Sequence, residues 1–197
     1  MYSGEAITYY EVTMQHSADS LLALSRMQYD LFCTRNRIVR TILSAVLVII
    51  GVLNYSAWWG ILLLAYGCYL TTSTYVSPDR TAHKLTAQIK QSGKPFPCSR
   101  YCFENGGLHI FAMPENTELD PLPYSEVERV GENANYFFIF RDQFGGYMVP
   151  KEALGDKVDA FRTFIEEKTG KPVALKASPF RRMLARMKRR EDEPYHL

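Results

Sequence analysis

The most informative absence in this sequence of 197 residues is the lack of charge over one long stretch. Residues 41–78 contain no Asp, Glu, Lys, Arg or His. The stretch is about twice the ~20 residues with which one helix crosses a hydrocarbon core of ~30 Å, so it is too long and too apolar for a surface loop. We predict two membrane-spanning helices, residues 41–57 and 59–76, folded back on each other. A helical hairpin buried inside a soluble protein is the alternative, which the lack of charge disfavours.

Catalytic and metal-binding patterns are also missing. The four cysteines, Cys33, Cys68, Cys98 and Cys102, are scattered, which argues against a secreted disulfide framework. Cys98 and Cys102 form a lone C-x3-C with His109 as the nearest imidazole, and we favour reduced cysteines over a zinc site. Because the sequence contains no recognisable motif for catalysis, cofactor binding or metal binding, we predict a protein that is not an enzyme and has no cofactor.

Basic and tryptophan side chains mark the ends of the two predicted spans. The reversal at residues 54–57 adjoins the two tryptophans, as in the aromatic belt of a membrane interface, and has no basic residue. The positive-inside rule therefore predicts that both termini are cytoplasmic in a multi-pass protein. The apolar stretch begins too far along the chain for a cleaved leader, so we expect the anchor to be retained. The residues that we assign to the membrane interface are Arg35, Arg37, Arg40, Trp58, Trp59, Arg80 and Lys84.

Outside the charge-free stretch the pattern is that of short strands. Residues 6–15 are rich in β-branched and aromatic side chains and predict a strand, followed by a helix with Ser17 as its N-cap. We expect this first strand to join the sheet of the later strands, although the hairpin separates them. The fold class that we predict is α+β: a transmembrane helical hairpin plus a small antiparallel β-barrel-like cytoplasmic domain, capped by a C-terminal helix. Alternation and turn residues place the later elements near residues 100–112, 122–130, 136–140 and 147–150, with an amphipathic helix at 156–168.

Six segments occur in a characteristic order. They are Tyr10-Glu-Val-Thr-Met, Asp19-Ser-Leu-Leu, Tyr101-Cys-Phe-Glu-Asn-Gly-Gly-Leu, Leu122-Pro-Tyr-Ser-Glu-Val-Glu-Arg-Val, Tyr136-Phe-Phe-Ile-Phe and Met148-Val-Pro-Lys-Glu-Ala-Leu. With the hairpin after the second segment, this order resembles the YcxB-like bacterial membrane proteins, whose C-terminal region looks like a pleckstrin-homology (PH) domain. The resemblance extends over about residues 5–168 and implies a bacterial inner-membrane location. It implies no catalytic residues, because the family has no established activity.

The C-terminal tail is strongly basic. Residues 171–197 contain eight Lys or Arg and three Asp or Glu. Its apolar residues recur at helical spacing and its cations fill the other faces, which predicts a helix lying on the membrane surface among anionic headgroups. A solvated basic tail is the alternative, and a nucleic-acid partner is disfavoured because no aromatic stacking platform accompanies the tail. The residues predicted to contact the membrane surface are Phe180, Arg181, Arg182, Met183, Leu184, Arg186, Met187, Lys188, Arg189 and Arg190.

These patterns divide the chain into residues 1–40, a cytoplasmic strand and helix; 41–76, the transmembrane hairpin; 77–170, the PH-like domain; and 171–197, the tail. We predict a membrane-anchored binding or scaffolding protein whose domain recognises a protein, peptide or lipid headgroup near the bilayer. The protein partner is unknown, and a homo-oligomer stays an open alternative. The other function considered is a regulator or immunity-type protein acting through its hairpin on another membrane protein. Small residues that would allow such helix packing are Gly51, Ala57, Gly60, Ala65 and Gly67.

Overall fold

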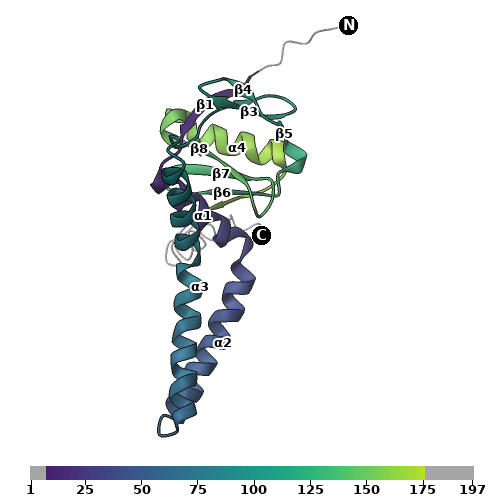
Figure 1. Cartoon of the computed structure of the whole chain (residues 1–197). Coiled ribbons are helices and arrows are strands. Elements are labelled where there is room, and N and C mark those ends of the chain that lie inside the picture. Colours follow the sequence, from purple (N-terminus) through teal and green to yellow (C-terminus); the bar gives the residue numbers. More distant parts are fainter. Residues whose placement is uncertain (1–7, 176–197) are drawn as a thin grey trace, which may run out of the picture.

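The computed structural model describes residues 8–175, and within them the chain is α+β, as predicted. One antiparallel sheet, one mixed sheet and two helices, α1 and α4, form a head domain, from which the antiparallel helices α2 and α3 extend together (Figure 1). We call α2 and α3 the helix pair. The residue bounds are α1 (Ala18–Phe32), α2 (Thr34–Leu53), α3 (Trp58–Gln91) and α4 (Val158–Thr169).

The first helix begins where the sequence predicts. The Ser20 N–H donates to Ser17 Oγ at 3.2 Å, and the Ser17 N–H donates to Ser20 Oγ at 2.8 Å. This reciprocal capping satisfies two N–H groups that a helix N-terminus otherwise leaves unpaired. The helix stops at Cys33, whose φ of −103° and ψ of 9° depart from helical values, and α2 starts one residue later.

Helix α3 extends well past the predicted end of the second span at residue 76, because it continues through Pro78 to Gln91. A proline inside a helix removes one backbone hydrogen bond. Contacts with α1 hold the helix here: Arg26 Nε and Nη2 donate to the Asp79 carboxylate at 2.8 and 2.9 Å, and the Tyr29 hydroxyl lies 3.1 Å from Ser77 Oγ. Tertiary packing thus outweighs the local helix-breaking signal.

The strands form two sheets rather than one closed barrel. A 3₁₀ turn at Tyr124–Glu126 carries the chain from the first sheet to the second, so the ladder does not continue between them. The prediction of antiparallel strands is therefore confirmed, but the described residues do not form the barrel-like domain that we predicted. The first sheet contains β1 (Tyr10–Gln15), β2 (Cys98–Phe103), β3 (Gly107–Met113), β4 (Thr117–Glu118) and β5 (Leu122–Pro123). The second contains β6 (Arg129–Glu132), β7 (Tyr136–Phe140), β8 (Gly146–Pro150) and β9 (Val173–Leu175).

The expectation that the N-terminal strand joins the later strands is confirmed. β1 pairs antiparallel with β2, from Tyr10 opposite Phe103 to Gln15 opposite Cys98. Val12 and Met14 alternate inward and are buried. The head domain is thus built from both sides of the helix pair in sequence, which fixes both ends of the pair to one folded body.

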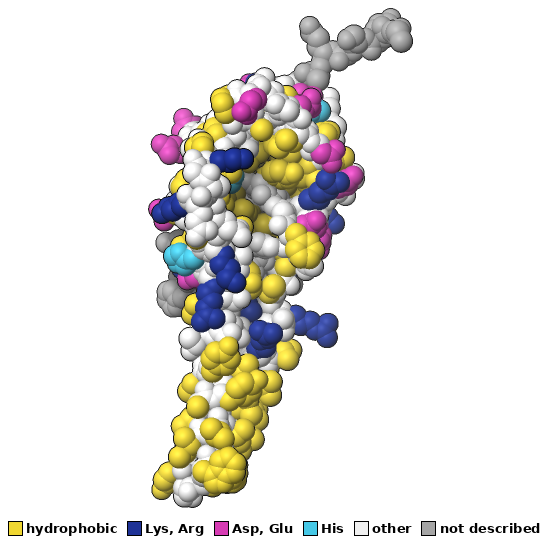
Figure 2. Space-filling view, in the orientation of Figure 1, with side chains coloured by type: hydrophobic (Ala, Val, Ile, Leu, Met, Phe, Trp, Pro, Cys, Tyr) yellow, Lys and Arg dark blue, Asp and Glu magenta, His cyan; other side chains and the backbone are white. Residues whose placement is uncertain are grey.

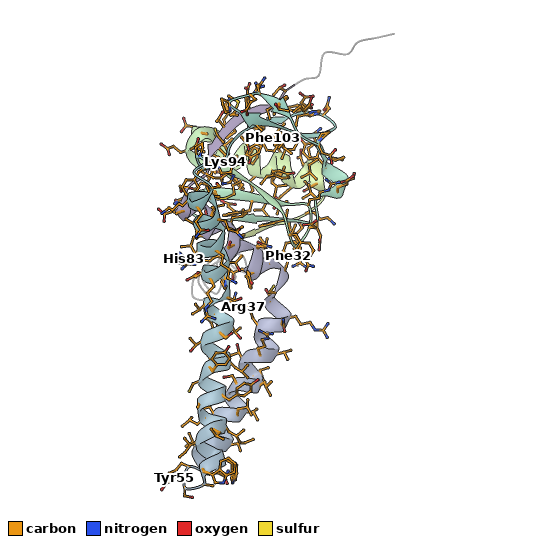
Figure 3. All side chains as sticks on the ribbon, in the orientation of Figure 1. Phe32, Arg37, Tyr55, His83, Lys94 and Phe103 are labelled. Carbon is orange, nitrogen blue, oxygen red and sulfur yellow. The ribbon has the colours of Figure 1, made fainter. Side chains whose placement is uncertain are left out.

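The core between the sheets is aromatic. Phe161 of α4 packs edge-on against Tyr10 and Phe103, with ring centroids 5.1 and 5.0 Å apart, and Phe137 lies 5.1 Å from the same ring. Phe103 lies inside the head domain in Figure 3. The residues from Phe137 to Phe140 are all buried, so the aromatic strand serves as core.

Several elements were not predicted, among them the two-residue strand β4. A 3₁₀ segment, Lys151–Lys157, precedes α4, so the helix starts later than the sequence pattern indicates. Strand β9 pairs parallel with β6, with Val173 opposite Val130. A three-residue strand next to Pro172 is too short for a clear alternation pattern, which is why the sequence did not reveal it.

Candidate functional site

The helix pair leaves most of its apolar surface uncovered. In Figure 2 this surface is a continuous area of hydrophobic side chains that starts where the head domain ends. Only 11% of the most apolar part of α2 is buried, so the rest of the described chain does not cover this helix. Exposed apolar residues of the pair include Ile38, Val39, Ile42, Ile49, Leu53 and Ile61.

Within the described residues, α2 is the one helix that is long and apolar enough to cross a membrane. The prediction of two spans is therefore supported for the first span only. The second predicted span lies in the first half of α3, where tyrosines and the hydroxyl residues from Thr71 to Thr74 lower the hydropathy. Some of these hydroxyls are bonded within the helix: Thr72 Oγ1 donates to the Cys68 carbonyl at 3.0 Å.

The predicted interface residues lie at the two ends of the helix pair. The three arginines of α2 and the Arg80 and Lys84 side chains of α3 belong to the end near the head domain, where Figure 2 shows a band of basic side chains. Arg37 forms an ion pair with Asp30 and its guanidinium lies 5.1 Å from the centre of the Tyr75 ring. Trp58 and Trp59 adjoin the turn at the far tip, where Figure 3 labels Tyr55.

Small residues allow the two helices to pack closely. A Cβ atom added at Gly67 would lie 2.8 Å from Val48 Cγ2, and one at Gly51 would lie 2.7 Å from the Leu64 backbone nitrogen. Ser44 Oγ donates to the Gly67 carbonyl at 2.6 Å, a hydrogen bond that joins the helices inside their interface. Gly60 is also buried, against the turn residue Asn54.

Three of the five small residues are thus used inside the chain rather than offered to a partner. Of the other two, Ala65 is exposed and Ala57 is partly exposed. The glycines explain how the two helices of the pair pack closely. A regulator that bound another membrane protein through these small residues would have only Ala57 and Ala65 left for that contact.

Within the head domain, helix α1 lies between the helix pair and the second sheet. On one side it holds α3 through the pair of Arg26 with Asp79. On the other side Met27 packs against Gly131 of β6 so closely that an added Cβ would lie 2.8 Å from the Met27 sulfur. The ring of Phe32 also packs edge-on against Phe140, at 5.6 Å between centroids. The head domain is therefore held in one orientation relative to the helix pair.

A pocket of about 390 Å³ opens where α1, α2 and β6 meet. Its walls are mostly apolar, and two arginines line it, Arg35 from α2 and Arg129 from β6. The sequence identified only Arg35, as an interface residue. Arg129 is far away in the chain, and no local pattern connects it with the start of α2. The lining residues are Leu31, Phe32, Thr34, Arg35, Ile38, Val39 and Arg129.

A second charged cluster lies inside the head domain. The carboxylate of Glu132 is buried and receives hydrogen bonds from Arg162 Nε and Nη2, each at 2.7 Å, and from Lys151 Nζ. Burial alone would raise the pKa of Glu132, but the hydrogen bonds from Arg162 and Lys151 outweigh it and lower this pKa below its ordinary value. Because all partners are protein groups, the cluster ties β6 to α4 rather than presenting a free acid.

The cysteine and histidine residues weighed for zinc lie on neighbouring strands. Cys102 is opposite His109 in the β2–β3 ladder, and burial raises the pKa of the Cys102 thiol, which disfavours the thiolate that a metal needs. His109 Nδ1 instead lies 2.7 Å from Glu118 Oε1. Among residues 8–175 no three His, Cys, Asp or Glu side chains are grouped as metal ligands. The predicted surface helix at residues 180–190 lies outside the described residues.

Comparison with known proteins supports the resemblance seen in the sequence. The family model described as YcxB-like protein matches residues 107–165. In the fold this segment runs from β3 to α4, so it contains the bend between the sheets and the core helix but not the helix pair. This segment of the chain is therefore similar to the YcxB-like family. No curated protein matches the chain. No solved structure matches it either.

Proposed function

We propose that this chain is a membrane-anchored binding protein. In this proposal the helix pair crosses a bacterial inner membrane twice, with both termini in the cytoplasm. The head domain is a PH-like module held at the cytoplasmic surface, where it recognises a protein, a peptide or a lipid headgroup. The observation that carries the proposal is the uncovered apolar surface of the helix pair, which ends at the basic residues next to the head domain.

Such a surface needs a non-aqueous environment. Soluble monomers rarely expose a contiguous apolar patch of more than a few hundred Å². Beyond Arg40 the uncharged part of α2, residues 41–53, gives about 20 Å of helix, and the uncharged turn at residues 54–57 extends it toward the ~30 Å hydrocarbon thickness of a bilayer. A bilayer would cover all sides of the pair at once, and it explains why the uncovered surface stops at the charged band.

The second helix supports a two-span hairpin, although it is less apolar. Its first part runs antiparallel to α2, and the Asn54–Ala57 turn at the far tip contains no charged residue. A turn without charged residues can cross the hydrocarbon core to the opposite membrane interface. The exposed tryptophan and tyrosine rings beside the turn are favoured at that interface. Three threonine hydroxyls of α3 are compatible with lipid because those of Thr72 and Thr74 bond to helix carbonyls and that of Thr71 bonds to Ser44.

We assign a PH-like fold to the head domain because of how its sheets and its C-terminal helix are arranged. Two mainly antiparallel sheets enclose one aromatic core, and the C-terminal helix α4 covers it, while the YcxB-like match extends over the segment from β3 to α4. The rigid attachment through α1 would present the same face of this module to the bilayer in every copy. A fixed orientation of the head domain relative to the bilayer suits a domain that binds its ligand at the membrane surface.

The test is to express full-length protein with a C-terminal reporter that fluoresces only in the cytoplasm, and to wash membranes with carbonate. We expect a fluorescent protein that stays in the pellet. A second variant, Val46→Arg, places a charge on the uncovered face of α2, where membrane insertion loses ~2.5–3.5 kcal/mol. It should reduce the membrane-resistant fraction, whereas Val46→Leu should not. Extraction of the wild type, or equal behaviour of the two variants, contradicts the anchor.

A further inference from the structure

We propose that the pocket between α1, α2 and β6 binds one anionic phospholipid of the cytoplasmic leaflet. Its phosphate would lie between Arg35 and Arg129, and an acyl chain would follow Ile38 and Val39. This inference rests on the proposed membrane anchor, and it makes a lipid headgroup, among the three ligand classes above, the one that this part of the protein recognises.

The pocket lies at the depth where a phospholipid changes from polar to apolar. Arg35 is in the first turn of α2, and Ile38 and Val39 follow one turn farther toward the tip. These two apolar side chains are 54% and 57% exposed, so the pocket opens directly onto the surface that the acyl chains would cover. A lipid of the surrounding leaflet would reach this opening by lateral diffusion, with its headgroup at the level of the basic residues of α2.

The polar side of the pocket is complementary to a negative headgroup. Arg35 is exposed and has no ion-pair partner within residues 8–175. Arg129 donates one N–H to the Leu31 carbonyl, and its guanidinium lies 4.7 Å from the centre of the Phe32 ring. Its Nε is 3.9 Å from the Glu128 carboxylate, a loose contact with an exposed acid. A phosphate between two guanidinium groups forms the charge-assisted hydrogen bonds that arginine favours.

The pocket is held open before any lipid enters. Phe32 forms its wall and is fixed from behind by Phe140 of β7 and from the front by Arg129. The helix break at Cys33 turns Thr34 and Arg35 away from the line of α1, which creates the space. Its volume of about 390 Å³ falls within the ~300–1,000 Å³ of small-molecule pockets. A preformed site avoids part of the ordering cost of binding.

The test measures lipid retained by purified full-length protein in detergent, by native mass spectrometry with phosphatidylglycerol or phosphatidylcholine as the probe. We expect phosphatidylglycerol to bind one per chain and more tightly than phosphatidylcholine. Arg35→Gln should weaken it about fivefold, the effect of one interfacial cation. The matched control, Arg40→Gln, removes the same charge from an exposed position of α2 outside the pocket and should change the affinity less than twofold.

A steric pair of variants tests the acyl half. Val39→Phe fills the pocket and should reduce binding at least as much as Arg35→Gln, whereas Val46→Phe adds the same bulk elsewhere on α2 and should leave binding unchanged. Equal losses for Arg35→Gln and Arg40→Gln, or for the two phenylalanine variants, overturn the pocket in favour of diffuse attraction to a basic surface. Glycerol phosphate, which lacks acyl chains, should not compete, and competition at equal concentration overturns the acyl assignment.

The two proposals fail in different ways. If carbonate extracts the wild-type protein, the anchor itself is wrong. If the wild type stays in the membrane but Arg35→Gln and Arg40→Gln retain phosphatidylglycerol equally, the anchor stands and only the lipid pocket is wrong.

Discussion

Replacing Glu132 by glutamine tests how the head domain is held together. The change keeps the shape of the side chain but leaves Arg162 and Lys151 without their carboxylate. Removing one partner of a fully buried ion pair costs ~3–5 kcal/mol. The cations here keep 31% and 17% of their side-chain surface exposed and regain some hydration, so we expect a loss of about 2 kcal/mol near neutral pH.

The same cluster predicts the pH dependence. The folded-state pKa of Glu132 is lowered from 4.5, so its contribution is present above that pH and is lost as the pH falls through the lower folded value. The difference between wild type and Glu132→Gln should therefore be large at neutral pH and disappear in acid. The head domain is followed by the near-ultraviolet circular dichroism of its tyrosines during urea unfolding of the full-length protein in detergent.

A matched control is Glu128→Gln, just before the same strand. Glu128 is 51% exposed and only loosely paired with Arg129, so its change should stay within ~0.5 kcal/mol. If Glu132→Gln is as stable as Glu128→Gln at neutral pH, the cluster does not stabilise the fold. A difference that persists unchanged in acid would refute the electrostatic explanation.

Three further predictions concern how the parts are joined. Gly131→Leu should separate α1 from β6 and lower the melting temperature of the head domain, whereas Gly106→Ala, with nothing within 4 Å of an added Cβ, should not; equal melting temperatures would contradict the close contact. Gly67→Leu should force the helix pair apart and increase proteolysis in detergent, while Ala65→Leu at an exposed position leaves it unchanged, and equal cleavage would argue against this interface. Deleting residues 1–16 removes β1 and should lower the melting temperature of the head domain by several degrees, and an unchanged value would show that the strand is dispensable.

The sequence was sufficient for features that depend on local pattern. The charge-free stretch predicted a helical pair with its turn at Asn54–Ala57, alternation predicted β2, β3 and β7, and Ser17 marked the start of α1. It also allowed the expectation that β1 joins the sheet, since a lone strand leaves its backbone groups unpaired.

What the sequence did not predict depends on contacts between distant residues. Pro78 is a helix breaker by local rules, yet α1 packs against α3 and the helix continues. Arg129 belongs to a strand, and only the fold brings it beside Arg35 to complete the pocket. The burial of Glu132 against α4 likewise follows from tertiary packing and has no local sequence signal.

The central claim, that the helix pair crosses a bilayer, is tested most directly with the two tryptophans of the chain, which both lie at the far tip. Full-length protein is placed in vesicles with the head domain outside, and tryptophan emission is measured with brominated lipids and with external iodide. We predict strong quenching by bromine near the headgroups, weaker quenching by bromine at the bilayer centre, and none by iodide. Quenching by iodide, or none by any brominated lipid, would contradict the account.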